Sequence, residues 1–183
     1  MRKLIVLMML VSCVSLSTGC MSRAIKEGVG VAMGAKGVSF ISSGFAGGEV
    51  AAPLGTFTRF QVDSFVNQSP VAVPATVNAM LPQYVAEELQ KKKIPNVADG
   101  RTLTIRGAYI YYEDASKATD QVFGPFEEVI ARVQFLDGGN LVGEAICVGR
   151  SGETVNMGPD KKASGLAKAI ANLIDKHYPK RTE

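Results

Sequence analysis

The chain has very little of the two side chains on which many metal sites and catalytic sites depend. It contains one histidine, His177, and three cysteines. A zinc site needs several Cys or His ligands at fixed spacing, and a nucleophilic triad needs a histidine beside its nucleophile. We therefore predict no metal, no cofactor and no enzymatic activity, and expect His177 to pack or cap at the end of the last helix.

The apolar run at the N-terminus is too short for a comfortable membrane span. Leu4 to Val14 is eleven residues long, whereas crossing the hydrocarbon takes roughly 20. Arg2 and Lys3 precede this run, and a stretch of small residues follows it up to Gly19. This order is typical of a secretory signal, so we predict that residues 1–19 are a signal peptide and lie outside the fold.

Residues 17–20, with the sequence STGC, resemble the lipobox of bacterial lipoproteins. In that family the Cys thiol receives a diacylglycerol and becomes the first residue after cleavage. The family usually has Leu three places before the Cys, where this chain has Ser17, with Leu16 one place earlier. The resemblance implies lipidation at Cys20 and, because Met21 is not Asp, sorting to the outer membrane on its periplasmic side. The alternative is a secreted protein in which Cys20 is a free thiol.

Excess charge of one sign is also missing. The chain has 20 basic and 17 acidic residues, but Arg2 and Lys3 leave with the signal, so the remainder carries a net charge of +1. A protein that follows a phosphate backbone needs a clustered basic surface. The only dense run is residues 91–93, three lysines that we expect at a solvated helix end. We therefore predict no nucleic-acid partner.

Cysteine is too scarce for an internal disulfide. Cys13 leaves with the signal and Cys20 is expected to carry lipid, so Cys147 is the remaining thiol. Stability then has to come from a hydrophobic core, which the 163 residues after Cys20 are enough to build. Cys147 lies in an apolar strand pattern, and we predict that it is buried and unreactive.

The segment from Ser22 to Gly55 is rich in glycine and poor in charge. Glycine loses more backbone entropy on folding than any other residue, which favours a tether. The spacings Gly30 to Gly34 and Gly44 to Gly48 also allow a glycine-zipper contact helix, and a ligand-binding loop is a third alternative. We predict that residues 20–55 form a lipid-anchored tether and that residues 56–183 form one domain.

Regular apolar spacing divides the domain into six segments. These are a strand at Thr56–Val66, a helix at Pro74–Lys92, strands at Thr102–Glu113, Glu127–Asp137 and Leu141–Arg150, and a helix at Pro159–Tyr178. Residues 137–140, DGGN, predict a tight hairpin. The order β-α-β-β-β-α predicts an α+β fold, with a four-stranded, mainly antiparallel sheet and two helices on one face.

Two details of these segments are open from the sequence. Pro82 either kinks the first helix or lies in its first turn, with the helix then beginning near Leu81. In the strand at Thr102–Glu113, alternation places Tyr109 and Tyr111 on the apolar face and Tyr112 on the polar face.

Acidic pairs occur at residues 87–88, 113–114 and 127–128, but sequence neighbours point in different directions on a helix or strand. We therefore expect no acid and base pair from them.

The element order, with RFQVDSFVN at residues 59–67 as the first strand, resembles small bacterial envelope lipoproteins. It is also similar to the two-helix, sheet-backed domains of curli-secretion and Tol-type envelope proteins. The resemblance implies a non-enzymatic binding or scaffold role in assembly, with an envelope protein as partner. The alternative is an envelope hydrolase whose site the sequence does not display.

The face of the sheet away from the helices is the expected contact surface. Its polar side chains are expected to be Thr104, Arg106, Tyr112, Arg132 and Gln134. An uncovered strand edge could add a partner strand by backbone pairing.

Overall fold

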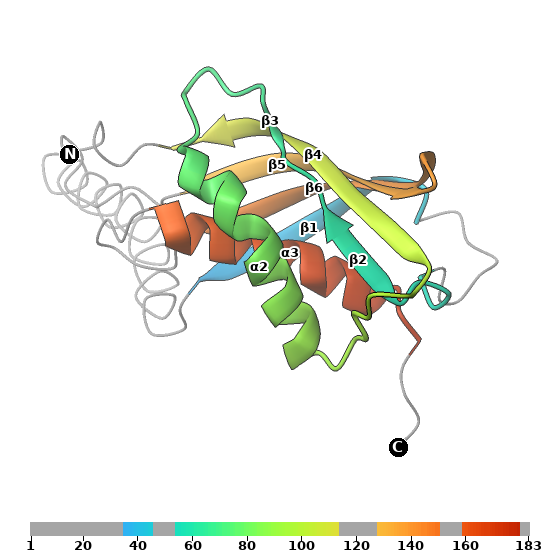
Figure 1. The fold of residues 1–183 in the computed structure, drawn as a ribbon. Coiled ribbons are helices and arrows are strands. Elements are labelled where there is room, and N and C mark those ends of the chain that lie inside the picture. The colour runs from blue at the N-terminus through green and yellow to red at the C-terminus, as the bar shows by residue number, and fades with distance from the viewer. Residues whose placement is uncertain (1–34, 46–53, 114–127, 151–158, 180–183) are drawn as a thin grey trace, which may run out of the picture.

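A computed structural model describes residues 35–45, 54–113, 128–150 and 159–179. Within these ranges the chain folds into one mixed six-stranded sheet with two helices (Figure 1). The predicted signal peptide and Cys20 lie outside the described residues. In chain order the elements are β1 Lys36–Ser43, β2 Arg59–Val62, β3 Val66–Asn67, α2 Ala75–Lys91, β4 Thr102–Tyr112, β5 Glu128–Asp137, β6 Asn140–Arg150 and α3 Pro159–Lys176.

The sheet has the strand order β1-β6-β5-β4-β2, and the short strand β3 also pairs with β4. Pairing is antiparallel from β1 through β4, whereas β2 and β3 run parallel to β4. Both helices lie on the same side of the sheet in Figure 1. The α+β class and the mainly antiparallel sheet are therefore confirmed, but the predicted number of four strands is wrong.

One additional strand comes from the segment predicted as a tether. β1 pairs with β6 over most of its length, from Lys36 opposite Arg150 to Ser43 opposite Glu144. Gly37 is needed there for packing, because an added Cβ would lie 2.3 Å from the backbone nitrogen of Ala169 in α3. Residues 36–43 therefore belong to the sheet. The rest of the predicted tether, 20–34 and 46–53, lies almost wholly outside the described residues.

The other additional strand arises because the predicted first strand divides in two. β2 and β3 are separated by residues 63–65, and Phe65 turns its ring into the core with 3% of its surface exposed. The irregular apolar spacing at Phe57 and Phe65 reflects this break. Both pieces use β4 as their hydrogen-bonding partner.

Helix α2 continues through Pro82, so the alternative start near Leu81 is wrong. Lys93, two residues after the end of α2, is left-handed, with φ of 59°. The amide of Ile94 donates to the carbonyl of Leu89 at 3.0 Å, and that of Lys93 donates to Gln90 at 2.9 Å. This pair of bonds satisfies the last carbonyls of a helix, so the lysine run lies at a helix end as predicted.

Helix α3 and the β5–β6 hairpin agree closely with the sequence. The predicted apolar face of α3 is buried, with Leu166, Ile170 and Ile174 fully covered. At the hairpin, Gly138 and Gly139 have φ of 54° and 93°, values that favour glycine. The two strands pair antiparallel on either side of the turn, as expected.

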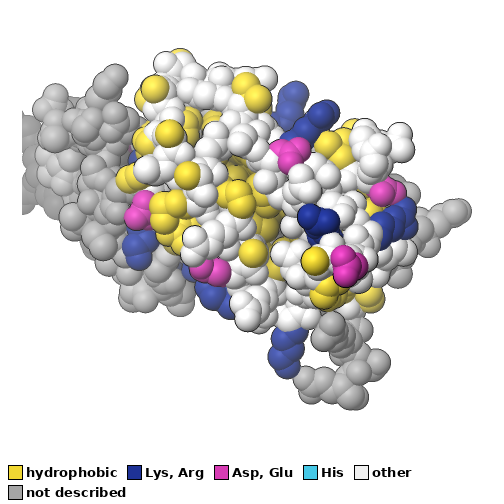
Figure 2. All heavy atoms as spheres, in the orientation of Figure 1, with side chains coloured by type: hydrophobic (Ala, Val, Ile, Leu, Met, Phe, Trp, Pro, Cys, Tyr) yellow, Lys and Arg dark blue, Asp and Glu magenta, His cyan; other side chains and the backbone are white. Residues whose placement is uncertain are grey.

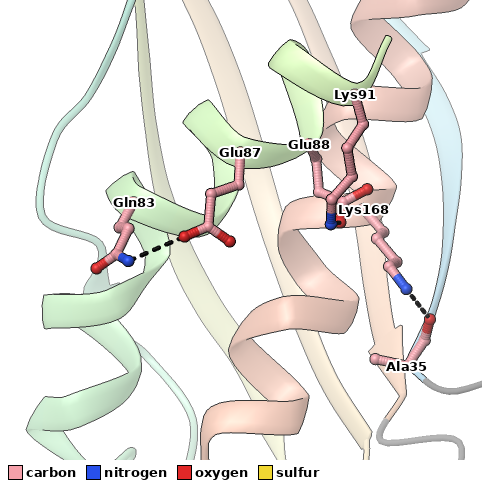
Figure 3. A network of polar contacts seen from close by, with 6 residues as sticks. All are labelled: Ala35, Gln83, Glu87, Glu88, Lys91 and Lys168. Atoms are coloured by element: carbon pink, nitrogen blue, oxygen red, sulfur yellow. Dashed lines mark hydrogen bonds and ion pairs between the residues drawn. The ribbon is translucent and has the colours of Figure 1, made fainter.

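Charged side chains on the helix-bearing side stand in small, separate groups of both signs (Figure 2). In one of them, Lys91 Nζ lies 2.7 Å from Glu88 Oε1, while the neighbouring Glu87 accepts from Gln83 (Figure 3). Glu87 and Glu88 therefore face different partners, as predicted for adjacent residues on a helix.

Candidate functional site

Because both helices cover one side of the sheet, the strands present their other side chains on an uncovered side. We call this side the open face. Strand pairing and alternation assign to it Val38, Phe40 and Ser42 of β1, Glu144, Ile146 and Val148 of β6, Ile130, Arg132 and Gln134 of β5, and Thr104, Arg106 and Tyr111 of β4.

A row of polar side chains crosses four strands of the open face. Ser42 Oγ donates to Glu144 Oε1 at 3.2 Å, and Gln134 Nε2 donates to Glu144 Oε2 at 2.8 Å. Arg106 Nε in turn donates to Gln134 Oε1 at 3.2 Å. We call these side chains, together with Arg132, the polar row. Its one carboxylate, that of Glu144, is hydrogen-bonded on both oxygens and so links β6 to β1 and β5.

Arg132 is the most available charge of the polar row. Its side chain is 60% exposed, whereas that of Glu144 is 18% exposed, and the two lie 3.8 Å apart between Nε and Oε1. An exposed ion pair of this length contributes little to stability. The guanidinium can therefore exchange this contact for a partner without a large loss in the fold.

The other half of the open face is apolar. Val38 pairs with Val148, Val148 with Ile130, and Ile130 with Tyr111, which forms one continuous apolar row across four strands. Phe40 lies beside it, and the exposed fractions are 50% for Val38, 60% for Phe40 and 42% for Tyr111. Contiguous exposed apolar side chains of this kind mark contact surfaces. We call these residues, with Ile146, the apolar patch.

The prediction for Tyr111 and Tyr112 is wrong, and a β-bulge is the reason. The pairing with β5 shifts between Tyr109 and Tyr111, so Ile110 is an additional residue in β4. An additional residue reverses the alternation that follows it. Tyr112 is consequently 5% exposed on the helix side, with Lys162 Nζ 4.3 Å above its ring, and Tyr111 takes its place on the open face.

The other predicted contact residues, Thr104, Arg106, Arg132 and Gln134, lie on the open face. The apolar patch escaped the prediction, although alternation at Val38 and Phe40 could have indicated two of its six residues.

The two outer edges of the sheet differ in how their backbones are satisfied. At the β2 and β3 edge, the amide of Phe60 donates to Asn96 Oδ1 at 2.9 Å, and the side-chain amide of Asn78 bonds both the N–H and the C=O of Phe65. Val97 N also donates to Thr58 O at 2.8 Å. This edge is therefore capped.

At the β1 edge, no hydrogen bond from another described segment reaches the backbone of residues 37–41 on the side away from β6. The nearest such bond precedes the strand, where Lys168 Nζ of α3 donates to Ala35 O at 2.9 Å (Figure 3). In an antiparallel edge strand, alternate residues turn both N–H and C=O outward. With respect to the described residues, the β1 edge is therefore open.

The residues that carry reactive groups are placed for packing. Cys147 is buried, as predicted, and burial raises the pKa of its thiol to about 12. His177 stacks on Phe45 with ring centroids 4.9 Å apart. Burial, followed by the charge of Lys176, lowers the pKa of His177, and among the described side chains its Nε2 has no hydrogen-bond partner.

The described ranges contain no group of three metal-ligating side chains. Within the same ranges, neither α2 nor α3 is long and apolar enough to cross a membrane.

No protein-family model matches the sequence, and no curated protein matches it. Among solved structures, the fold is similar to that of PelC from Paraburkholderia phytofirmans, described as a dodecamer in two crystal forms, one of them of a point variant. The similarity covers 79% of this chain and 99% of PelC, with a TM-score of 0.50 and 18% or 16% identical residues. At this level of identity the comparison supports the fold.

Proposed function

We propose that this chain is a lipid-anchored protein of the bacterial envelope that acts as a non-enzymatic, oligomeric scaffold. The observation that carries the proposal is the open face, where a polar row and an apolar patch share a sheet that two helices hold from behind. The similar fold of PelC, which forms dodecamers, supports an assembly of many copies. We further propose that this assembly serves polysaccharide export at the outer membrane, the role that the similarity to PelC suggests.

The anchor is the first part to test. Cells labelled with radioactive palmitate should yield a labelled wild-type protein, and Cys20→Ser should be unlabelled. Fractionation of the membranes should then find the wild type in the outer membrane, since Met21 is not Asp. Equal labelling of both proteins contradicts the anchor.

The scaffold is tested by the mass of the full-length protein extracted in detergent. Light scattering should give a multiple of the monomer mass. Phe40→Glu and Arg132→Glu should reduce this mass, because each places a negative charge on the open face. Asn172→Glu, on the exposed side of α3, is the matched control and should leave the mass unchanged. A wild-type monomer at all concentrations contradicts the proposal.

The hydrolase alternative has a direct test of its own. Turnover of a peptidoglycan fragment or an ester that disappears in His177→Ala, while the variant keeps its thermal transition, would overturn the scaffold proposal. The stacking of His177 on Phe45 favours the opposite result, in which no turnover is measured for either protein.

A further inference from the structure

The open edge of β1 has definite ends. At its C-terminal end, the pairing with β6 shifts between Ile41 and Ser43, which makes Ser42 a bulged residue. A bulge bends an edge strand and ends regular pairing. At its N-terminal end stands the cation of Lys36. The regular part of the edge is therefore residues 37–41, and Ser39 is its centre.

Helix α3 holds this edge in place from the covered side. An added Cβ on Gly37 would lie 2.4 Å from the carbonyl oxygen of Gly165, so strand and helix are in backbone contact. The hydrogen bond from Lys168 to Ala35 O ties the entry to β1 to the same helix. A docking edge that is already ordered loses little entropy when a second strand pairs with it.

The side chains of this edge are complementary to themselves. If two copies of β1 run antiparallel about Ser39, Val38 of each copy lies opposite Phe40 of the other. Aromatic and β-branched side chains form a favourable cross-strand pair. Here Val38 is 50% exposed and Phe40 is 60% exposed. Moving the centre of the pair by one residue, to Phe40 or to Val38, would place Phe40 opposite Phe40 or Val38 opposite Val38 and lose the mixed pair.

Charge agrees with the same register. Lys36 of each copy lies just beyond the regular pairing, toward Ser42 of the other copy, and that serine donates to Glu144 on the next strand. This register keeps the two ammonium groups apart, whereas centring the pair closer to Lys36 would bring the two cations together. Like charges directly opposite each other destabilise a strand pair.

The other edge of the sheet cannot serve as the partner without losing bonds. A head-to-tail contact of β1 with β2 and β3 would have to displace Asn96 from the amide of Phe60 and Asn78 from Phe65. Val97 also lies on that edge through its bond to Thr58. A second copy of β1 would displace no hydrogen bond that the described residues make at this edge.

We propose that β1 of one copy pairs antiparallel with β1 of a second copy about Ser39, which joins two six-stranded sheets and the two apolar patches. The proposal rests on the oligomeric scaffold proposed above and names its contact. A contact of this kind is two-fold and closes as a dimer, so a larger assembly contains an even number of copies.

Cysteine pairs test the register in the full-length, lipid-anchored protein. Val38→Cys and Phe40→Cys, produced in the same cells with different tags, should form a mixed disulfide, because directly opposite residues lie within disulfide range. Each variant alone should stay uncross-linked, because the same residue in two copies is then separated by about 8 Å between Cα atoms, from two residues of rise and one strand spacing. Cys147 is buried and does not compete.

Val97→Cys is the matched control, since Val97 is 52% exposed on the capped edge. A mixed disulfide between Val38→Cys and Val97→Cys, or none between Val38→Cys and Phe40→Cys, overturns the β1 pair. If light scattering still gives an oligomer in that case, the scaffold survives with another interface. A monomer without any cross-link contradicts both proposals.

Discussion

The two edges of the sheet are built in opposite ways. β1 is an eight-residue antiparallel strand whose outer backbone faces no described segment, whereas β2 and β3 are strands of four and two residues that run parallel to β4. The short strands cannot satisfy their own backbones, so Asn78 and Asn96 supply side-chain amides. Among the described residues, the β2 and β3 edge is therefore closed to a partner strand and the β1 edge is open to one.

The same two edges are also held to the core by different forces. β1 depends on close packing, because Gly37 lies against the backbone of α3 and the following Phe45 packs on Phe135 with ring centroids 5.2 Å apart. The β2 and β3 edge depends on hydrogen bonds from side chains. Substitutions that remove volume or add it should therefore act on the first edge, and substitutions that remove amides should act on the second.

Removal of residues 1–55 should have the largest effect. It deletes β1 together with Phe45 and Leu54, which are 6% and 0% exposed. Because burying each large apolar side chain contributes about 2 kcal/mol, the free energy of unfolding should fall by about 4 kcal/mol or more. Urea unfolding of the fragment 56–183, compared with 35–183, measures the difference. Equal stability would mean that β1 is not part of the core.

Asn78→Ala should have the next largest effect. Asn78 bonds the N–H of Phe65 at 3.1 Å, its C=O at 2.8 Å and the hydroxyl of Tyr109 at 2.8 Å. Leaving three such groups unpaired should lower the free energy of unfolding by about 3 kcal/mol. Asn96→Ala removes one bond and should lower it by about 1 kcal/mol in the same denaturation experiment. If both variants lose the same free energy of unfolding, Asn78 does not cap this edge in the way described.

Gly37→Ala should have a smaller effect that is specific to the β1 edge. Its methyl group would meet the backbone of Ala169 and Gly165, so α3 has to move, at a cost of about 2 kcal/mol. Ser39→Ala, two residues along the same strand, adds no atom and should change stability by less than about 0.5 kcal/mol. Thermal unfolding of the two variants measures the difference. A larger loss of stability in Ser39→Ala than in Gly37→Ala would contradict the packing of Gly37 against α3.

The smallest effect should be a change of stability with pH that arises from His177, which stacks on Phe45 just after β1. Since the pKa of His177 is lowered in the folded protein, the unfolded chain binds more protons as pH falls through the ordinary value of ~6.5. The stabilising contribution is therefore complete above that pH and decreases below it. Melting temperatures between pH 7.5 and 5.5 should fall more for the wild type than for His177→Phe, which keeps an aromatic ring beside Phe45. Parallel curves would exclude this role.

Elements defined by neighbouring residues could be predicted from the sequence. The apolar face of α3 follows from a spacing that repeats every turn, and the β5–β6 hairpin follows from a four-residue turn sequence in which Gly138 and Gly139 take positive φ. β1 could not be found in this way, because its partner lies about a hundred positions later and its inner face carries Gly37 and Ser39. The exchange of Tyr111 and Tyr112 was hidden for a similar reason, since the bulge at Ile110 exists only in relation to β5.

The sequence by itself determined the two helices, the central hairpin and the burial of Cys147, because each depends on periodicity or turn chemistry within a few residues. Only the tertiary structure decided that a glycine-rich segment becomes an edge strand, that Asn78 and Asn96 cap the opposite edge, and that the apolar patch lies beside the polar row. These features depend on contacts between residues far apart in the chain, where strand register and close backbone packing, rather than local propensity, set which groups are satisfied and which remain available.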